Sequence, residues 1–210
     1  MKREVQLLIL AEVIFLFGSG LYGPIYAIFV QKIGGDILDA GAAYALFLIS
    51  MATLEYPVGK LMDKYGKKYF LFSGYLLATV VIFGYMFVEN VMQLFILQIL
   101  MGIAFAIGDP SWDAWFSDII PKKKSGFDWA VFHMVAGYSA GFSALIGGAV
   151  AKYLGFSTLF FIGGMIAIFS AFTVLSINEM QFGSRRRGKQ SNKIHHRGHG
   201  FKRRVKMKSH

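Results

Sequence analysis

Six long stretches of the sequence carry no charged side chain, and short polar segments separate them. The uncharged stretches are residues 13–30, 40–54, 69–88, 91–108, 129–151 and 153–178. Each is close to the ~20 residues that cross the hydrocarbon core of a bilayer as a tilted helix. They are apolar throughout instead of alternating, which disfavours a transmembrane barrel. The pattern therefore predicts an all-α membrane protein with six transmembrane helices.

The pattern also divides the chain into two regions. We expect a six-helix transmembrane domain over residues 1–178 and a basic, disordered cytoplasmic tail over residues 179–210. The tail holds too few apolar residues to fold alone, and its Lys and Arg side chains would attract anionic lipid headgroups. We do not expect nucleic-acid binding, because the tail shows no repeated pattern of aromatic residues between the basic ones. Metal binding by His195, His196 and His199 is a weaker interpretation than a solvated tail.

The basic residues predict the orientation of the six helices. With the N-terminus in the cytoplasm, 20 of the 22 Lys and Arg residues fall on the cytoplasmic side, and only Lys32 and Lys152 lie outside. This asymmetry follows the positive-inside rule. We expect an integral protein of the cytoplasmic (inner) membrane of a prokaryote, with both termini cytoplasmic.

Composition agrees with a membrane protein and excludes some chemistry. Charged residues make up 16% of the chain and mean hydropathy is +0.51, whereas soluble domains contain about 25% charged residues. The sequence has no cysteine, which excludes disulfides and iron–sulfur sites. It holds no catalytic constellation, phosphate-binding glycine loop or metal-ligand spacing in the membrane domain, so we expect no enzyme activity, cofactor or metal.

An internal repeat is visible at an offset of 89 residues. It pairs three glycines of the first half with three of the second: Gly59, Gly66 and Gly74 with Gly148, Gly155 and Gly163. The offset maps the first three predicted helices onto the last three. Because three is odd, the two copies would be inverted in the membrane, as in the repeats of many transporters.

A ten-residue motif lies between the second and third predicted helices. Residues 59–68 read GKLMDKYGKK, which resembles the loop pattern G-x-L-A-D-R-x-G-R-K of major facilitator superfamily transporters; Met62 departs from it. The resemblance implies that the loop helps to gate one face of a transporter and that Asp63 acts as the latch. The alternative is that its charges only set topology. The gating-motif residues are Gly59, Leu61, Asp63, Lys64, Gly66, Lys67 and Lys68.

Two further family patterns occur in altered form. Residues 98–106 resemble R-x-x-Q-G-x-G-A-A with Gln98 in place of the arginine that the family links to proton-coupled movement. Gln98 could bind substrate or make an interhelical contact. Residues 143–148 keep only the Gly-Gly of a Gly-Pro-x-x-Gly-Gly element, within a small-residue face that lets another helix approach closely. The predicted packing residues are Gly137, Gly141, Ala144, Gly147 and Gly148.

The resemblance implies a central cavity between the first and fourth helices. Seven-residue spacing places Glu12, Ser19 and Tyr26 on one side of the first helix. The predicted cavity residues are Ser19, Tyr22, Tyr26, Gln98 and Phe105. Acids inside membranes are costly and are functional candidates. Glu12 and Asp109 are therefore the candidates for coupling to an ion, and a charge network with the cytoplasmic lysines is the alternative for these acids and for Glu55 and Asp113.

The whole pattern resembles the N-terminal six-helix half of a major facilitator transporter. The expected function is secondary transport, as a permease or efflux protein, of a small solute by alternating access. A complete member has two such halves, so the partner would be a second half in a homodimer or heterodimer. The alternative is a non-transporting six-helix membrane protein, or a truncated transporter fragment, with a lipid-binding polybasic tail.

Overall fold

The computed structural model describes residues 3–177, apart from the side chains of Asp63 and Lys124. The predicted tail, residues 179–210, lies outside the described residues. Seven α-helices and three short 3-10 helices follow one another along the chain: α1 (Arg3–Gly20), η1 (Gly23–Ile25), α2 (Tyr26–Lys32), α3 (Ile37–Tyr65), α4 (Lys67–Gly84), η2 (Tyr85–Phe87), α5 (Val91–Ile119), η3 (Lys122–Lys124), α6 (Ser125–Leu154) and α7 (Phe156–Leu175).

These elements form six spans that are long and apolar enough to cross a membrane. Seven α-helices make six spans because α1, η1 and α2 together form one broken span over Arg3–Lys32. No strand occurs between residues 3 and 177. The predicted fold class, all-α with six membrane-crossing helices, is confirmed.

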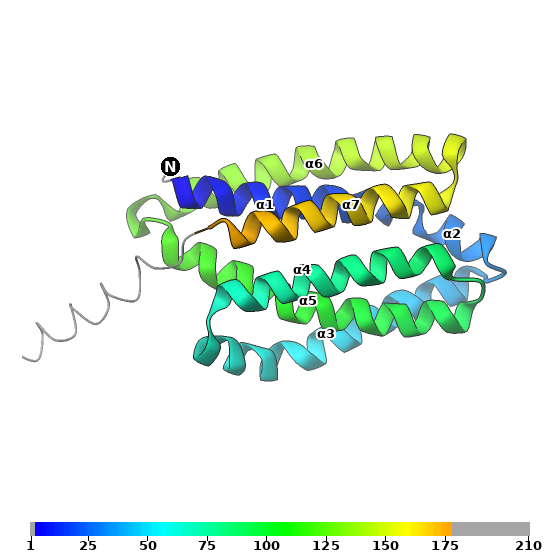
Figure 1. Cartoon of the computed structure of the whole chain (residues 1–210), viewed down its shortest axis with the longest axis horizontal. Coiled ribbons are helices and arrows are strands. Elements are labelled where there is room, and N and C mark those ends of the chain that lie inside the picture. The colour runs from blue at the N-terminus through cyan, green and yellow to red at the C-terminus, as the bar shows by residue number, and fades with distance from the viewer. Residues whose placement is uncertain (1–2, 178–210) are drawn as a thin grey trace, which may run out of the picture. The chain divides into compact units, whose positions relative to one another are not determined.

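The helices pack as two groups of three that are not consecutive in sequence. The helix α1 lies against α6 and α7, while α5 lies against α3 and α4, and α4 joins the groups by packing on α7 (Figure 1). Exchanging the first three spans with the last three turns one set of contacts into the other. The arrangement therefore has the symmetry that the 89-residue repeat predicts, with each first helix packed against the other copy's second and third helices.

Two one-residue connections lie at equivalent positions of the repeat. Gly66 separates α3 from α4 with φ of +102°, and Gly155 separates α6 from α7 with φ of +87°. Side chains rarely tolerate this backbone region, so glycine is the residue that fits there. The expectation of a loop over residues 59–68 is wrong, because α3 continues through Gly59 to Tyr65 and only Gly66 lies outside a helix.

The third glycine pair of the repeat lies at close approaches between helices. A Cβ added at Gly74 on α4 would lie 2.8 Å from the Cα of Gly108 on α5. At the equivalent place, a Cβ added at Gly163 on α7 would lie 3.1 Å from the carbonyl oxygen of Gly18 on α1. Small residues let apolar helices pack backbone to backbone, so these contacts hold each three-helix group together.

The first span is broken between the end of α1 and the start of α2, beyond its middle, and the uncharged run over residues 13–30 does not reveal this break. Pro24 occupies the start of η1, where its missing N–H and fixed φ are tolerated. The broken region is held by α6, since a Cβ at Gly147 would collide with the backbone of Leu21 and one at Gly20 would collide with Ser143. The break turns α2 away from the line of α1 and sets the position of Tyr26.

Candidate transport cavity

A cavity of about 260 Å³ lies between residues of the first four spans. All five residues predicted to line a substrate cavity contribute to its wall: Ser19, Tyr22, Tyr26, Gln98 and Phe105. They come from α1, the η1–α2 break and α5. The other lining residues are Gly23, Tyr44, Phe47, Tyr85 and Met101.

The sequence reasoning missed the other five lining residues, and two of them, Tyr44 and Phe47, show why. Both lie on α3, the least buried span, with 11% of its apolar window inside the structure. Tyr44 is 56% exposed, and the edge of the Phe47 ring faces the Phe105 ring at 5.3 Å between centroids. Hydropathy does not separate a lipid-facing side of a helix from a cavity-facing side. The three-residue spacing of Tyr44 and Phe47 places both on one face of a helix, and this spacing was the signal available in the sequence.

Gln98 contributes both to the wall and to a contact between spans. Its side chain is 5% exposed, and its amide Nε2 donates a hydrogen bond to the hydroxyl of Tyr26. The two interpretations of Gln98, a cavity group and a satisfied interhelical contact, are therefore compatible. The bond ties α5 to α2 just beyond the break in the first span.

An aromatic bridge connects the cavity to a buried carboxylate. The Phe105 ring in the wall lies 5.8 Å from the Phe15 ring, and Phe15 stacks on Tyr75 with centroids 4.1 Å apart. The hydroxyl of Tyr75 donates a hydrogen bond to the carboxylate of Glu12. Glu12 is 7% exposed and Tyr75 is 1% exposed, so this acid lies in the packed interior between α1 and α4.

Three more carboxylates lie around Glu12, and they form an electrostatic chain. Asp109 and Asp113 on α5 act on Glu12, and Glu55 on α3 acts on Asp109. His133 on α6 lies within electrostatic range of Asp113, and its ring packs near the rings of Trp129 and Phe132. Among the described side chains none of these four acids forms an ion pair with a lysine, so the alternative of a charge network with the cytoplasmic lysines has no described contact behind it.

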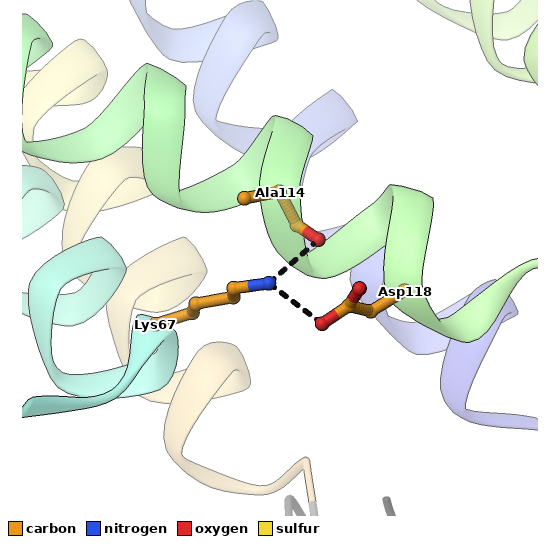
Figure 2. Close-up of polar contacts among 3 residues, drawn as sticks. All are labelled: Lys67, Ala114 and Asp118. Carbon is orange, nitrogen blue, oxygen red and sulfur yellow. Dashed lines mark hydrogen bonds and ion pairs between the residues drawn. The ribbon is translucent and has the colours of Figure 1, made fainter. Parts of the chain in front are cut away.

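Two lysines of the motif brace the end of the bundle at which α4 begins. The Nζ of Lys67 lies 2.6 Å from Oδ2 of Asp118 and donates to the carbonyl oxygen of Ala114 at 3.1 Å, both on α5 (Figure 2). The Nζ of Lys68 donates to the carbonyl oxygens of Leu175 and Ile177, at 2.7 and 2.6 Å. The start of α4 is thus tied to the ends of α5 and α7.

The remaining motif residues make fewer contacts. Gly59 lies inside α3, and a Cβ added there would meet nothing within 4 Å among the described residues. Leu61 is 48% exposed, and the Lys64 ammonium lies 5.0 Å from the centroid of the Tyr65 ring. The side chain of Asp63 lies outside the described residues, so its gating role stays a prediction.

The predicted small-residue face of α6 divides into two parts. Gly147 packs against Leu21 inside the six-helix unit. A Cβ at Gly137, Gly141 or Gly148 would meet nothing within 4 Å among the described residues, and Ala144 is partly exposed. The expectation of one common face is wrong for Gly147, because it lies on the side of α6 that faces α1.

Comparison with known proteins identifies the family. The model of the Major Facilitator Superfamily matches residues 8–206 of the chain. The chain belongs to this superfamily.

Three of the proteins to which this chain is similar have names that describe transport. An uncharacterized MFS-type transporter of Methanocaldococcus jannaschii is 29% identical over 171 residues, covering 81% of this chain and 44% of the relative. The multi-drug resistance efflux pump PmrA of Streptococcus pneumoniae is 32% identical over 174 residues, covering 79% and 43%. The proton-coupled antiporter flippase LtaA of Staphylococcus haemolyticus is 27% identical over 168 residues, covering 73% and 39%. The chain spans less than half the length of these relatives.

Family membership and the six apolar spans together establish that the chain is an integral membrane protein. Members of the superfamily move small solutes across lipid bilayers. The predicted cavity residues therefore lie in a member of the superfamily that the sequence motif resembles.

Proposed function

We propose that the chain is a six-helix half or subunit of a secondary transporter that moves a small solute by alternating access, without chemical conversion of the solute. The observation that carries this proposal is the cavity beside the broken first span. Broken helices and non-helical backbone within a membrane protein occur where they are buried in protein or line a cavity. The names of the relatives, an efflux pump and a flippase, support export as the direction.

Glu12 and Asp109 are the proposed coupling residues, and the proposed coupling ion is a proton. An ionised carboxylate at membrane depth is costly, and a proton removes that cost. Glu12 is linked to the cavity through Tyr75 and Phe15, and Asp109 lies one helical turn beyond Phe105. Occupation of the cavity and protonation of these acids could therefore influence each other over a short path.

The motif is the proposed gate, with its parts in different roles. Lys67 and Lys68 would keep the end of the six-helix unit rigid through the contacts in Figure 2 and at the end of α7. Asp63 would then be the latch toward a second half. A latch shifts the equilibrium between two conformational states only if its contacts differ between those states. A contact with a partner half that moves between the states would differ in this way.

A second six-helix half is the proposed protein partner, as a homodimer or heterodimer. The open face of α6, with Gly137, Gly141 and Gly148, and the exposed side of α3 are the surfaces proposed to receive it. Close packing on small residues would supply the contact.

We propose that both termini are cytoplasmic. Reporter fusions placed after Asn90 and after Lys123 should then give opposite locations, with Lys123 inside. An external signal from the Lys123 fusion would contradict this orientation.

Alternating access predicts that one cavity position is reached from both sides of the membrane. The sequence contains no cysteine, so Ser19→Cys would give a single label site in the cavity wall. We expect a membrane-impermeant maleimide to label it from either side, in the chain assembled with its partner half. Ser157→Cys is the control, because Ser157 is exposed at the start of α7 and should react from one side alone. One-sided labelling at position 19 would refute alternating access through this cavity.

A further inference from the structure

The cavity wall is unusually rich in aromatic rings. Six of its ten lining residues are aromatic: Tyr22, Tyr26, Tyr44, Phe47, Tyr85 and Phe105. None of the ten carries a charge. Aromatic faces attract cations through the ring quadrupole, and the attraction strengthens where water is excluded. The wall therefore favours an apolar ligand with delocalised positive charge.

The groups beyond the wall are acidic, and basic groups are absent from the lining helices near them. Asp109 follows Phe105 by one turn of α5, about 6 Å along the helix axis, and Glu12 joins the wall through the Phe15–Tyr75 stack. The sequence has no Lys or Arg within residues 4–31, 33–59 or 69–121. Charges of one sign close to a low-dielectric site concentrate ligands of the opposite sign there.

The same wall is poorly suited to two other ligand classes. An anionic ligand would find no basic side chain among the lining residues. A sugar headgroup needs many free hydrogen-bonding groups, whereas the Ser19 hydroxyl donates to the carbonyl oxygen of Leu16 and the Gln98 amide donates to Tyr26. Of the six hydrogen-bonding side chains in the wall, Ser19, Gln98 and Tyr26 thus already have a partner within the protein.

We propose that the cavity selects lipophilic organic cations, with the aromatic wall binding the apolar groups and Asp109 and Glu12 supplying the opposite charge. This inference rests on the proposed function, because it names the substrate class of the same cavity. Tyr44, which lies in the wall on α3, is 56% exposed, so the wall is not closed on that side.

Two ions of equal shape and opposite charge test this selectivity. Tetraphenylphosphonium and tetraphenylborate would each be titrated onto the purified full chain in an uncharged detergent, with protein-free detergent as the blank. We expect saturable binding of the phosphonium that is at least tenfold tighter than any binding of the borate. Equal affinities, or tighter binding of the borate, would overturn the proposal.

Matched variants locate the source of the selectivity. Asp109→Asn should weaken phosphonium binding at least fivefold, and Phe105→Leu should weaken it severalfold while keeping an apolar wall. Glu89→Gln removes the same charge from an exposed residue outside the cavity and should change affinity less than twofold. Elution as a single species by size exclusion would establish that each variant is folded. An Asp109→Asn variant that binds as tightly as Glu89→Gln would contradict the assignment.

The binding test and the labelling test at position 19 can fail separately, so failure of cation selectivity is distinguishable from failure of the proposed function. Two-sided labelling at position 19 without charge preference would leave a transporter and refute cation selectivity. Charge-selective binding with one-sided labelling would refute alternating access and leave the cation site.

Discussion

Gly74→Ala should disrupt the closest contact between α4 and α5. The added Cβ would lie 2.7 Å from the backbone nitrogen of Gly108, 2.8 Å from its Cα and 2.9 Å from the carbonyl oxygen of Ala104. Ordinary contacts of a Cβ lie at 3.4 Å or beyond, so the helices must separate by more than half an ångström. All three neighbours are backbone atoms and cannot rotate away. Overpacking of this kind costs about 1–3 kcal/mol.

The same separation should reach the candidate coupling site, because Tyr75 is the next residue along α4. Its hydroxyl donates to Glu12, and its ring stacks on Phe15 at 4.1 Å. A displaced α4 would weaken both contacts. We therefore expect Gly74→Ala to lower stability and also to impair any activity that depends on Glu12.

Thermal unfolding of the purified protein in detergent would measure the first effect, with Gly59→Ala as the matched control. Gly59 lies inside α3 with nothing within 4 Å of an added Cβ, and alanine is favoured over glycine in a helix by about 0.5–1 kcal/mol. The control should melt at or above the temperature of the unmodified chain, and Gly74→Ala should melt below it. Equal melting temperatures for the two variants would refute the close approach of α4 and α5.

Three further substitutions test other contacts. Tyr75→Phe keeps the ring stack but removes the donor to Glu12, so we expect a loss of about 1–3 kcal/mol in unfolding free energy; unchanged chemical unfolding would show that the bond adds no stability. Lys67→Met should lower the free energy of unfolding by about 1 kcal/mol, because it breaks the partly exposed ion pair with Asp118 in Figure 2. The same change at exposed Lys123 should lower it less, and equal losses would exclude a specific role of the ion pair. Gly141→Leu fills open space on α6, so it should leave thermal stability intact and reduce cross-linking to a second half; unaffected cross-linking would exclude this face.

Much of the fold was predictable because the lipid bilayer that surrounds the helices allows few backbone structures. An uncharged run of membrane length has few stable alternatives to a spanning helix, so the six spans followed from charge positions alone. The glycine repeat was weak evidence by itself. The structure gives it a physical basis, since Gly66 and Gly155 both adopt positive φ and Gly74 and Gly163 both lie at close helix contacts.

The details of the site were harder to predict because they depend on contacts between distant segments. The break at Pro24 lies inside an apolar run, and hydropathy does not indicate where the backbone changes direction. Tyr75 is 63 residues from Glu12, and nothing local to either residue indicates that they meet. In contrast, Ser19 and Phe105 were predictable as cavity residues because family resemblance supplied which helices face inward.

Transport itself would test the central claim most directly. The chain, assembled with its partner half, would be reconstituted into liposomes containing a pH-sensitive dye, and a compound panel including tetraphenylphosphonium would be added. We predict solute movement coupled to proton movement, with Glu12→Gln abolishing the dye response and Glu89→Gln preserving it. Solute movement by Glu12→Gln with an unchanged dye response would contradict coupling through the buried carboxylate next to this cavity.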